Sequence, residues 1–279
     1  MIYRKEFNLQ IATYAETKRI LKEYGLTARK SMGQNFLIDL HVLNKTIKAA
    51  GITSDDEVLE IGPGIGGLTQ PLLQSAKSVL AVEIDKKLAD VLKIILPAVE
   101  VVNADILDFT IPKHINKVVA NLPYYITTPV VMHLLENYCI ESITVMVQKE
   151  VAQRMAAAAG SKAYGALSLA VQYHATVYIA ANVPPNCFFP RPNVSSCVVR
   201  LDTLKTPPVT TDKAALFTNI RAGFGQRRKT LVNSLFSAET TSLSKDELAA
   251  VITSCGFSEK IRGEELTLQD WGRLTEALL

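Results

Sequence analysis

Four consecutive residues, Asn121-Leu122-Pro123-Tyr124, combine a side-chain amide, a backbone carbonyl held by the following proline and an aromatic face. An adenine amine is a poor nucleophile because its lone pair is delocalised into the ring. Accepting its protons on the Asn121 amide oxygen and the Leu122 carbonyl would turn that lone pair toward an electrophile, while Tyr124 stacks on the base. Enzymes that modify a base first take it out of its helix. The segment is therefore a candidate clamp for an extruded base.

A second motif, Glu60-Ile61-Gly62-Pro63-Gly64-Ile65-Gly66-Gly67, follows an expected strand and opens an expected helix. Its glycines permit a sharp turn and let a ligand approach the backbone closely. Gly62, Gly64 and Gly67 also satisfy G-x-G-x-x-G, so a dinucleotide is an alternative ligand, and this motif alone is weakly specific. Glu60 would repel a phosphate and favour a cationic ligand. S-adenosylmethionine fits, since it carries a sulfonium and an α-ammonium group and no phosphate.

Two further acids stand at the ends of the next expected strands. Glu83 closes one strand, where a carboxylate can accept both hydroxyls of a ribose. Asp105 follows the next, where it can accept a hydrogen bond from an adenine amine. With Glu60 they predict one cofactor site at one edge of a sheet.

The elements that position these residues alternate between short β-branched runs and helical stretches from about Asp56 to Leu201. This alternation predicts a doubly wound, Rossmann-like α/β sheet of parallel strands. The expected strands are 58–61, 78–82, 99–102, 117–120 and 143–147, with helices at 68–75, 86–95 and 129–137 and a closing antiparallel pair at 175–183 and 196–201.

The segment Thr203-Leu204-Lys205-Thr206-Pro207-Pro208 cannot continue a strand or a helix and is predicted to be a linker. Residues 1–203, with a helical lead-in at the N-terminus, are expected to form the S-adenosylmethionine-binding domain. Residues 209–279 carry only helical periodicity and are expected to form a small, all-α, RNA-binding domain.

Composition narrows the class further. The chain has 279 residues, 48% of them hydrophobic, which is enough for a substantial core. The four cysteines lie far apart and form no ligand-spaced cluster with the four histidines, which favours a reduced, cytoplasmic protein without a metal. No apolar run is suited to secretion or membrane insertion. The net charge of +3 is too small to prove a nucleic-acid partner.

Six strings together resemble the KsgA-type ribosomal RNA adenine dimethyltransferases, and the resemblance runs over nearly the whole chain. They are GQNFL (33–37), EIGPGIGGLT (60–69), NLPYYITTPVV (121–131), VQKEVAQR (147–154), FFPRPNVSS (188–196) and FGQRRKTL (224–231). The resemblance implies N6,N6-dimethylation of two adjacent adenosines near the 3′ end of 16S rRNA, with S-adenosylmethionine as donor. It also implies a partner in the small (30S) ribosomal subunit or its precursor, and a role in subunit biogenesis.

The same resemblance assigns residues to roles. It adds Phe188 to the Asn121–Tyr124 segment as a second stacking face. Ser195 stands where members commonly carry an acid, and no role is assigned to it. The cofactor site is expected to comprise Gln34, Asn35, Leu37, Glu60, Gly62, Gly64, Glu83, Ile84, Asp105, Ile106 and Asn121.

Basic residues gather in places suited to RNA phosphates, and folded RNA is read mostly through its shape and backbone. A monomer without a membrane partner is expected. The alternatives are a large-subunit rRNA methyltransferase of the macrolide-resistance type, a non-catalytic ribosome-assembly factor on the same fold, and a nicotinamide oxidoreductase. The candidate RNA-binding residues are Arg29, Lys30, Lys149, Arg154, Arg221, Arg227, Arg228 and Lys229.

Overall fold

The computed structural model describes residues 10–29, 32–239 and 241–279. These form two compact units. One comprises the described residues up to Ala152 together with Val177–Thr203, and the other comprises Gln153–Thr176 together with Leu204–Leu279. The sequence predicts that the chain passes from the first domain to the second only once, near residue 203. The contacts instead group Gln153–Thr176 with the C-terminal helices, because its side chains pack in their core.

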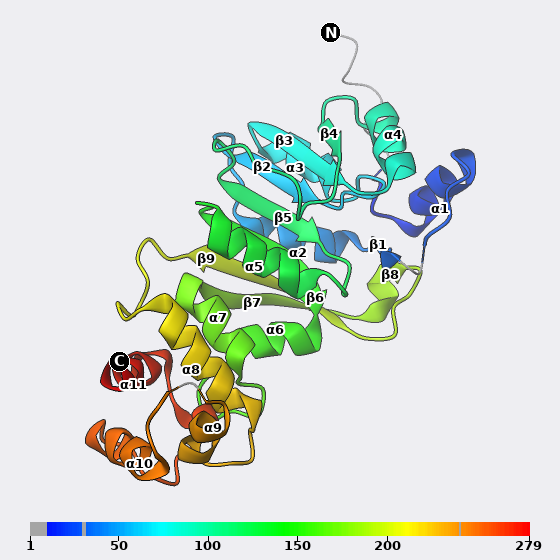
Figure 1. Cartoon of the computed structure of the whole chain (residues 1–279). Coiled ribbons are helices and arrows are strands. Elements are labelled where there is room, and N and C mark those ends of the chain that lie inside the picture. The colour runs from blue at the N-terminus through cyan, green and yellow to red at the C-terminus, as the bar shows by residue number, and fades with distance from the viewer. Residues whose placement is uncertain (1–9, 30–31, 240) are drawn as a thin grey trace. The chain divides into compact units, whose positions relative to one another are not determined.

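The first unit is built on a seven-stranded sheet (Figure 1). Its first five strands in spatial order are parallel, and β9 runs antiparallel to β6. The parallel strands lie where the sequence predicts them, since each is a short β-branched run that is apolar on both faces. In spatial order the strands are β4 (Glu100–Asn103), β3 (Ser78–Glu83), β2 (Glu57–Ile61), β5 (Lys117–Asn121), β6 (Ser142–Gln148), β9 (Ser196–Thr203) and β7 (Ala175–Val183).

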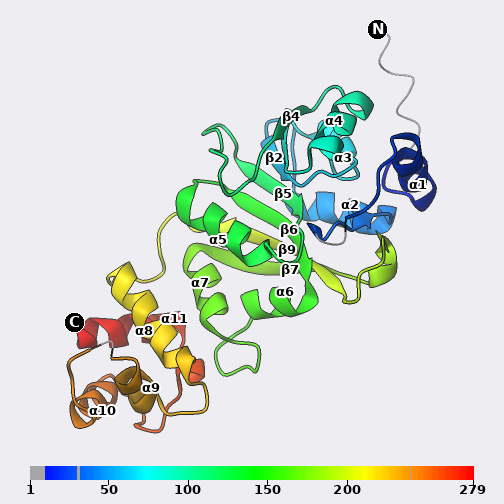
Figure 2. The ribbon, with the colours of Figure 1, turned by 45° about the vertical axis from the view of Figure 1, so that its right-hand side comes forward.

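Helices cover both faces of this sheet, with α5 on one face and α2 on the other (Figures 1 and 2). The ends of α2 are set locally: Asp39 accepts a hydrogen bond from the Val42 amide at 2.9 Å, and Gly51 ends the helix with φ +58°. This confirms the doubly wound arrangement. The helices are α1 (Tyr14–Glu23), α2 (Leu40–Ala50), α3 (Thr69–Ser75), α4 (Lys86–Ile95), α5 (Thr127–Asn137) and α6 (Lys149–Met155), the last of which reaches into the second unit.

Two distant segments of the first unit meet in a small sheet that the sequence does not predict. Strand β1 (Phe36–Leu37) pairs antiparallel with β8 (Phe188–Phe189), which follows the 3₁₀ turn η2 (Pro185–Cys187), with Leu37 opposite Phe188. All four strand residues belong to or pack against the main hydrophobic core. The pairing therefore ties the GQNFL segment to the FFPRP segment.

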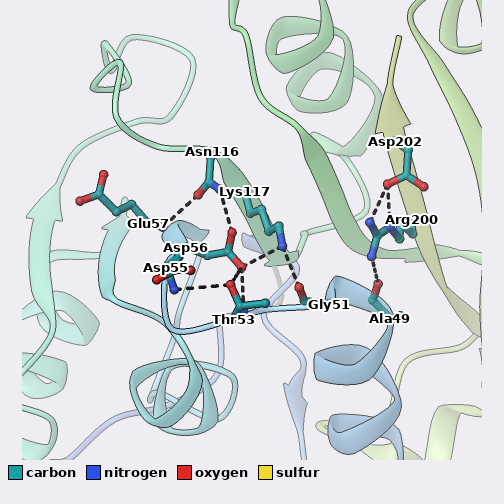
Figure 3. A network of polar contacts seen from close by, with 10 residues as sticks. All are labelled: Ala49, Gly51, Thr53, Asp55, Asp56, Glu57, Asn116, Lys117, Arg200 and Asp202. Atoms are coloured by element: carbon teal, nitrogen blue, oxygen red, sulfur yellow. Dashed lines mark hydrogen bonds and ion pairs between the residues drawn. The ribbon is translucent and has the colours of Figure 1, made fainter. Parts of the chain in front are cut away.

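The amino edge of the sheet carries a buried polar network (Figure 3). The Asp56 carboxylate accepts hydrogen bonds from the Thr53 amide at 2.6 Å, Asn116 at 2.7 Å and the Lys117 ammonium at 2.8 Å. Lys117 also donates to the Gly51 carbonyl at 2.7 Å. Beside this network Arg200 donates to the Ala49 carbonyl at the end of α2, at 2.7 Å. These bonds fasten the loop before β2 to the start of β5.

The second unit is helical. Trp271 is fully buried at its centre, and a Cβ added at Gly223 would lie 2.3 Å from the Trp271 ring, so only glycine fits there. The Tyr164 hydroxyl donates to the Leu266 carbonyl at 2.9 Å. Among the described residues no helix is long and apolar enough to cross a membrane. The elements are α7 (Ala166–His174), α8 (Lys213–Gly225), α9 (Leu231–Ser237), α10 (Lys245–Ser254), η3 (Gly263–Glu265) and α11 (Leu268–Leu278).

Candidate active site

One cavity lies at the carboxyl edge of strands β2, β3 and β5. Parallel strands end at the same edge, so residues far apart in the sequence converge there. All of the predicted cofactor residues line this cavity, as do Leu122, Pro123 and Tyr124. The lining residues among the predicted set are Gln34, Asn35, Leu37, Glu60, Gly62, Gly64, Glu83, Ile84, Asp105, Ile106, Asn121, Leu122, Pro123 and Tyr124.

Among the described residues, the charged side chains that line this cavity are all acidic. Within the described part of the chain, its lining contains the carboxyl groups of Glu60, Glu83 and Asp105 and no lysine, arginine or histidine. A phosphate-bearing ligand would meet acidic side chains and no basic side chain among the described lining residues. A ligand with positive charge is therefore favoured on electrostatic grounds.

Glu60, at the end of β2, is the most deeply buried of the three acids, at 1% exposed. Its Oε2 atom has no hydrogen-bond partner among the described residues. Burial raises the pKa of Glu60 to about 8; the Thr69 hydroxyl acts in the opposite direction, and the Glu83 charge adds to the rise. Burial thus favours the protonated form of Glu60, whereas the sequence suggests a standing negative charge.

Glu83, at the end of β3, is 5% exposed, and burial raises its pKa. Its two oxygens accept hydrogen bonds from the Gly64 amide at 3.1 Å and the Asp85 amide at 2.9 Å, which partly offset that rise. These bonds fix the carboxylate against the glycine turn. Each oxygen keeps a lone pair that can accept a ligand hydroxyl.

The glycine turn after β2 lines the cavity, where Gly62 has no side chain of its own to cover the backbone. Gly62 has φ +65°, and a Cβ added there would meet no atom within 4 Å. Its backbone therefore faces open space that a ligand can enter, and a side chain would be both strained and in the way. Asp105, after β4, is anchored by the Leu107 amide at 3.0 Å.

Asn121, the last residue of β5, has a fixed side chain. Its Nδ2 donates to the Asn35 backbone carbonyl at 2.9 Å. The amide oxygen Oδ1 is then the atom left to accept a proton from a ligand amine. The contact joins the GQNFL segment directly to the NLPY segment, which explains why both motifs occur in one site.

The rest of the segment is held just as firmly. The Tyr124 hydroxyl shares a 2.8 Å hydrogen bond with Ser196, and burial raises its pKa. Leu122 is buried, at 1% exposed, so its side chain belongs to the interior. The Pro123 carbonyl accepts from Thr127 at 3.2 Å at the start of α5.

Sequence reasoning missed Tyr125, which lines the cavity and is 60% exposed. It follows the NLPY segment directly, which is the signal that could have identified it. A Cβ added at Gly33, where φ is +62°, would lie 3.3 Å from the Pro123 Cβ and 3.6 Å from the Tyr125 ring. Gly33 therefore lets the loop and the aromatic pack closely at the cavity mouth.

Phe188 is not on the cavity. Its ring is 3% exposed and packs in the main core, because β8 pairs with β1. In this arrangement it cannot stack on a base opposite Tyr124 without leaving the core. Phe188 therefore does not line the described cavity, and its stacking role stays a prediction.

The predicted RNA-binding residues fall into distinct groups. Arg29 pairs with the buried Asp85 at 3.3 Å, and Gln34 donates to the same carboxylate at 3.3 Å. Arg227 pairs with Glu264 and donates to the Lys162 carbonyl at 2.8 Å. Lys30 lies outside the described residues. The other predicted cations are exposed: Lys149, Arg154, Arg221, Arg228 and Lys229.

The residues present suit a ligand that combines positive charge, ribose hydroxyls and a flat base. The partnerless Oε2 of Glu60 and the open face of Gly62 are the observations on which this fit depends. Among the described residues there is no group of three or more histidines, cysteines or acids that could hold a metal ion.

Fold and cavity together place the chain among the Rossmann-like methyltransferases. Dinucleotide-binding sheets keep their strands in the order 3-2-1-4-5-6, and here antiparallel β9 is inserted between β6 and β7. The model of the family described as "Ribosomal RNA adenine dimethylase" matches residues 25–267. The chain belongs to this family.

Individual relatives agree with the family. Over 94% of this chain and 96% of the relative, the chain is 50% identical to a ribosomal RNA small subunit methyltransferase A of Lachnoclostridium phytofermentans. A dimethyladenosine transferase of Plasmodium falciparum superposes with a TM-score of 0.74 at 28% identity, covering 85% of this chain and 95% of that one. The 23S rRNA methyltransferase ErmE superposes with a TM-score of 0.71 at 28% identity, covering 88% and 99%.

Proposed function

We propose that the protein transfers two methyl groups from S-adenosylmethionine to N6 of each of two adjacent adenosines near the 3′ end of 16S rRNA. The observation that carries the proposal is the convergence of Glu60, Glu83, Asp105 and Asn121 on one cavity without a basic side chain among its described lining residues. A nicotinamide dinucleotide would place its pyrophosphate among these acids, which weighs against the oxidoreductase alternative.

The residues of the chain divide the work of binding. Glu83 accepts the ribose hydroxyls, and Asp105 accepts a hydrogen bond from the adenine amine of the cofactor. The Gly62 turn admits the amino-acid portion beside Glu60. When bound, the cofactor supplies a methyl group already activated by its sulfonium. No metal is needed for such a transfer, and positioning supplies the main catalytic effect.

Asn121 orients the target amine. Because Nδ2 of Asn121 donates to the Asn35 carbonyl, Oδ1 of Asn121 accepts a hydrogen bond from one N–H of the amine. The Leu122 carbonyl accepts a hydrogen bond from the other N–H. The nitrogen lone pair is then directed out of the base plane toward the methyl group. Tyr124, held by Ser196, stacks on the base. The first transfer gives a methylated ammonium that loses one proton to solvent, so the amine enters the second round with one proton fewer and uses one of these two acceptors.

Exposed cations on the second unit, among them Arg221, Arg228 and Lys229, bind phosphates of the folded rRNA in this proposal.

The substrate is the small ribosomal subunit or its precursor, the place of action is the cytoplasm, and the protein acts as a monomer with a part in subunit biogenesis. The 50% identity to a small-subunit methyltransferase, against 28% to the 23S enzyme, favours the small subunit over the large one.

The test is incubation of the protein with undermethylated small subunits, or with large subunits, in the presence of labelled S-adenosylmethionine. Mass spectrometry of the digested rRNA should detect dimethyladenosine in 16S rRNA and none in 23S rRNA. A folded protein that binds small subunits and transfers nothing would support the non-catalytic assembly factor instead. Methylation confined to 23S rRNA would support the large-subunit alternative.

A further inference from the structure

Glu60 occupies an unusual position for a carboxyl group. It is 1% exposed, lines the cavity, and leaves Oε2 without a hydrogen-bond partner among the described residues. A buried polar atom without a partner is costly unless a ligand supplies one. The part of the site that faces Glu60 therefore fits a positively charged group.

The neighbours of Glu60 offer no compensating cation. From β3 comes Glu83, whose charge opposes ionisation of Glu60, and from α3 comes the neutral Thr69 hydroxyl. Beyond β4 lies Asp105, and at the end of β5 lies the neutral amide of Asn121. With these neighbours alone, the protonated form of Glu60 is favoured.

We propose that Glu60 releases its proton to solvent when the cationic methyl donor binds, and so distinguishes the donor from the demethylated product. The inference rests on the proposed function, since it takes S-adenosylmethionine as the donor. Donor and product share the α-ammonium group, but only the donor carries a sulfonium charge. An ionised Glu60 is stabilised by that extra charge and loses part of its stabilisation once the methyl group has left.

This property would help a reaction that needs several cofactor molecules per substrate. Each transfer converts a ligand that favours the ionised Glu60 into one that favours it less. Reprotonation of Glu60 from solvent then accompanies departure of the product. The proton count balances over one cycle, because the proton released on donor binding is regained on product release.

The experiment is isothermal titration calorimetry of S-adenosylmethionine and S-adenosylhomocysteine in two buffers of different ionisation enthalpy, from pH 6 to pH 9. The α-ammonium of either ligand titrates in the same range, so the informative quantity is wild type minus Glu60→Gln. Near pH 7 wild type should release close to one proton more than the variant on binding the donor, and fewer with the product. Its preference for donor over product should rise about tenfold from pH 6 to pH 9, while the variant's preference stays flat.

Asp90→Asn is the matched control, because it removes an exposed carboxylate from α4, outside the cavity. It should release protons as wild type does. Equal proton release by wild type and Glu60→Gln would overturn the inference while leaving the proposed function intact. Absence of any saturable donor binding by the folded wild type would overturn both.

A second measurement needs no variant. The difference infrared spectrum of wild type at neutral pH should lose a protonated-carboxyl band when the donor is added, and lose less of it when the product is added. An unchanged band with saturating donor would contradict the proposed proton release even if Glu60→Gln failed to fold.

Discussion

Strand β2 carries a buried carboxylic acid near each end, and the two acids have opposite environments. Asp56, just before the strand, accepts hydrogen bonds from Thr53, Asn116 and Lys117 (Figure 3). Burial alone would raise its pKa, but these bonds lower it to about 2. Glu60, at the other end, leaves one oxygen without a partner, and burial raises its pKa to about 8.

We infer from this difference that the amino edge stabilises the fold and that the carboxyl edge is suited to binding a ligand. A buried acid contributes to folding only when its charge is matched by hydrogen bonds and a counter-ion, as at the amino edge. An unmatched acid destabilises the fold, so its presence at the carboxyl edge points to a ligand that matches it. Substitutions at the two edges and beside the cavity test this contrast.

The largest effect is expected for Asn121→Ala at the carboxyl edge. The change removes the acceptor proposed to orient the target amine. Turnover should fall by on the order of 10²–10³-fold, which is the loss seen when other enzymes lose one positioned hydrogen-bonding group in the active site. Cofactor affinity and thermal stability should stay near wild type. Single-turnover methylation and calorimetric binding measure the two quantities. Exposed Asn137→Ala is the control, and full turnover by Asn121→Ala would remove Asn121 from its assigned role.

The next effect belongs to the amino edge. Asp56→Ala leaves the buried Lys117 ammonium, with its side chain 12% exposed, without its counter-ion. The free energy of unfolding should drop by about 3–5 kcal/mol, measured by denaturant titration. Asp90→Ala, which breaks an exposed pair with Lys86, should cost no more than about 1 kcal/mol. A small loss for Asp56→Ala would mean that the network at this edge does not stabilise the fold.

Opposite pH dependence separates the two acids more sharply. The pKa of Glu60 is higher in the folded state than the ordinary value of 4.5, so its contribution to stability is present at low pH and is lost as pH rises toward about 8. Glu60→Gln should therefore be more stable than wild type at pH 8, by on the order of 3 kcal/mol, and similar to it at pH 4.

The Asp56→Asn variant is the comparator for that series. The pKa of Asp56 is lowered to about 2, so its contribution is present above pH 4 and disappears as pH falls toward 2. Wild type should thus lose its advantage over Asp56→Asn in acid. Parallel pH profiles for the two variants would contradict the contrast between the edges.

The smallest effect is expected for Arg29→Gln. Because Arg29 pairs with Asp85 beside the cavity, its loss should change the salt dependence of subunit binding little and cofactor affinity by less than about twofold. Arg228→Gln, at an exposed position of the second unit, should make that salt dependence shallower by about one unit of slope. A shallower salt dependence of subunit binding for Arg29→Gln would support Arg29 as an RNA-binding residue, as the sequence predicts.

Much of this site follows from local pattern. The runs at 57–61 and 117–121 are short and mostly apolar on both faces. Their length and composition are enough to predict buried strands there. Once the strands were parallel, their final residues had to meet at one edge, which is why Glu83, Asp105 and Asn121 were predicted together. For Phe188 the sequence leaves both a stacking position and a core position open, and its pairing with Leu37, a residue distant in the sequence, places it in the core.

The sequence by itself therefore determined the alternation of strands and helices, the glycine turn and the identity of the groups at each strand end, because these depend on side-chain period and on neighbours in the chain. Only the tertiary structure decided that β9 enters the sheet antiparallel, that Gln153–Thr176 packs with the C-terminal helices, and that Arg29 pairs with Asp85. It also decided that the pKa of Glu60 is raised while that of Asp56 is lowered. Exclusion of water and the choice of hydrogen-bond partners come from segments distant in the sequence, and no local pattern encodes them.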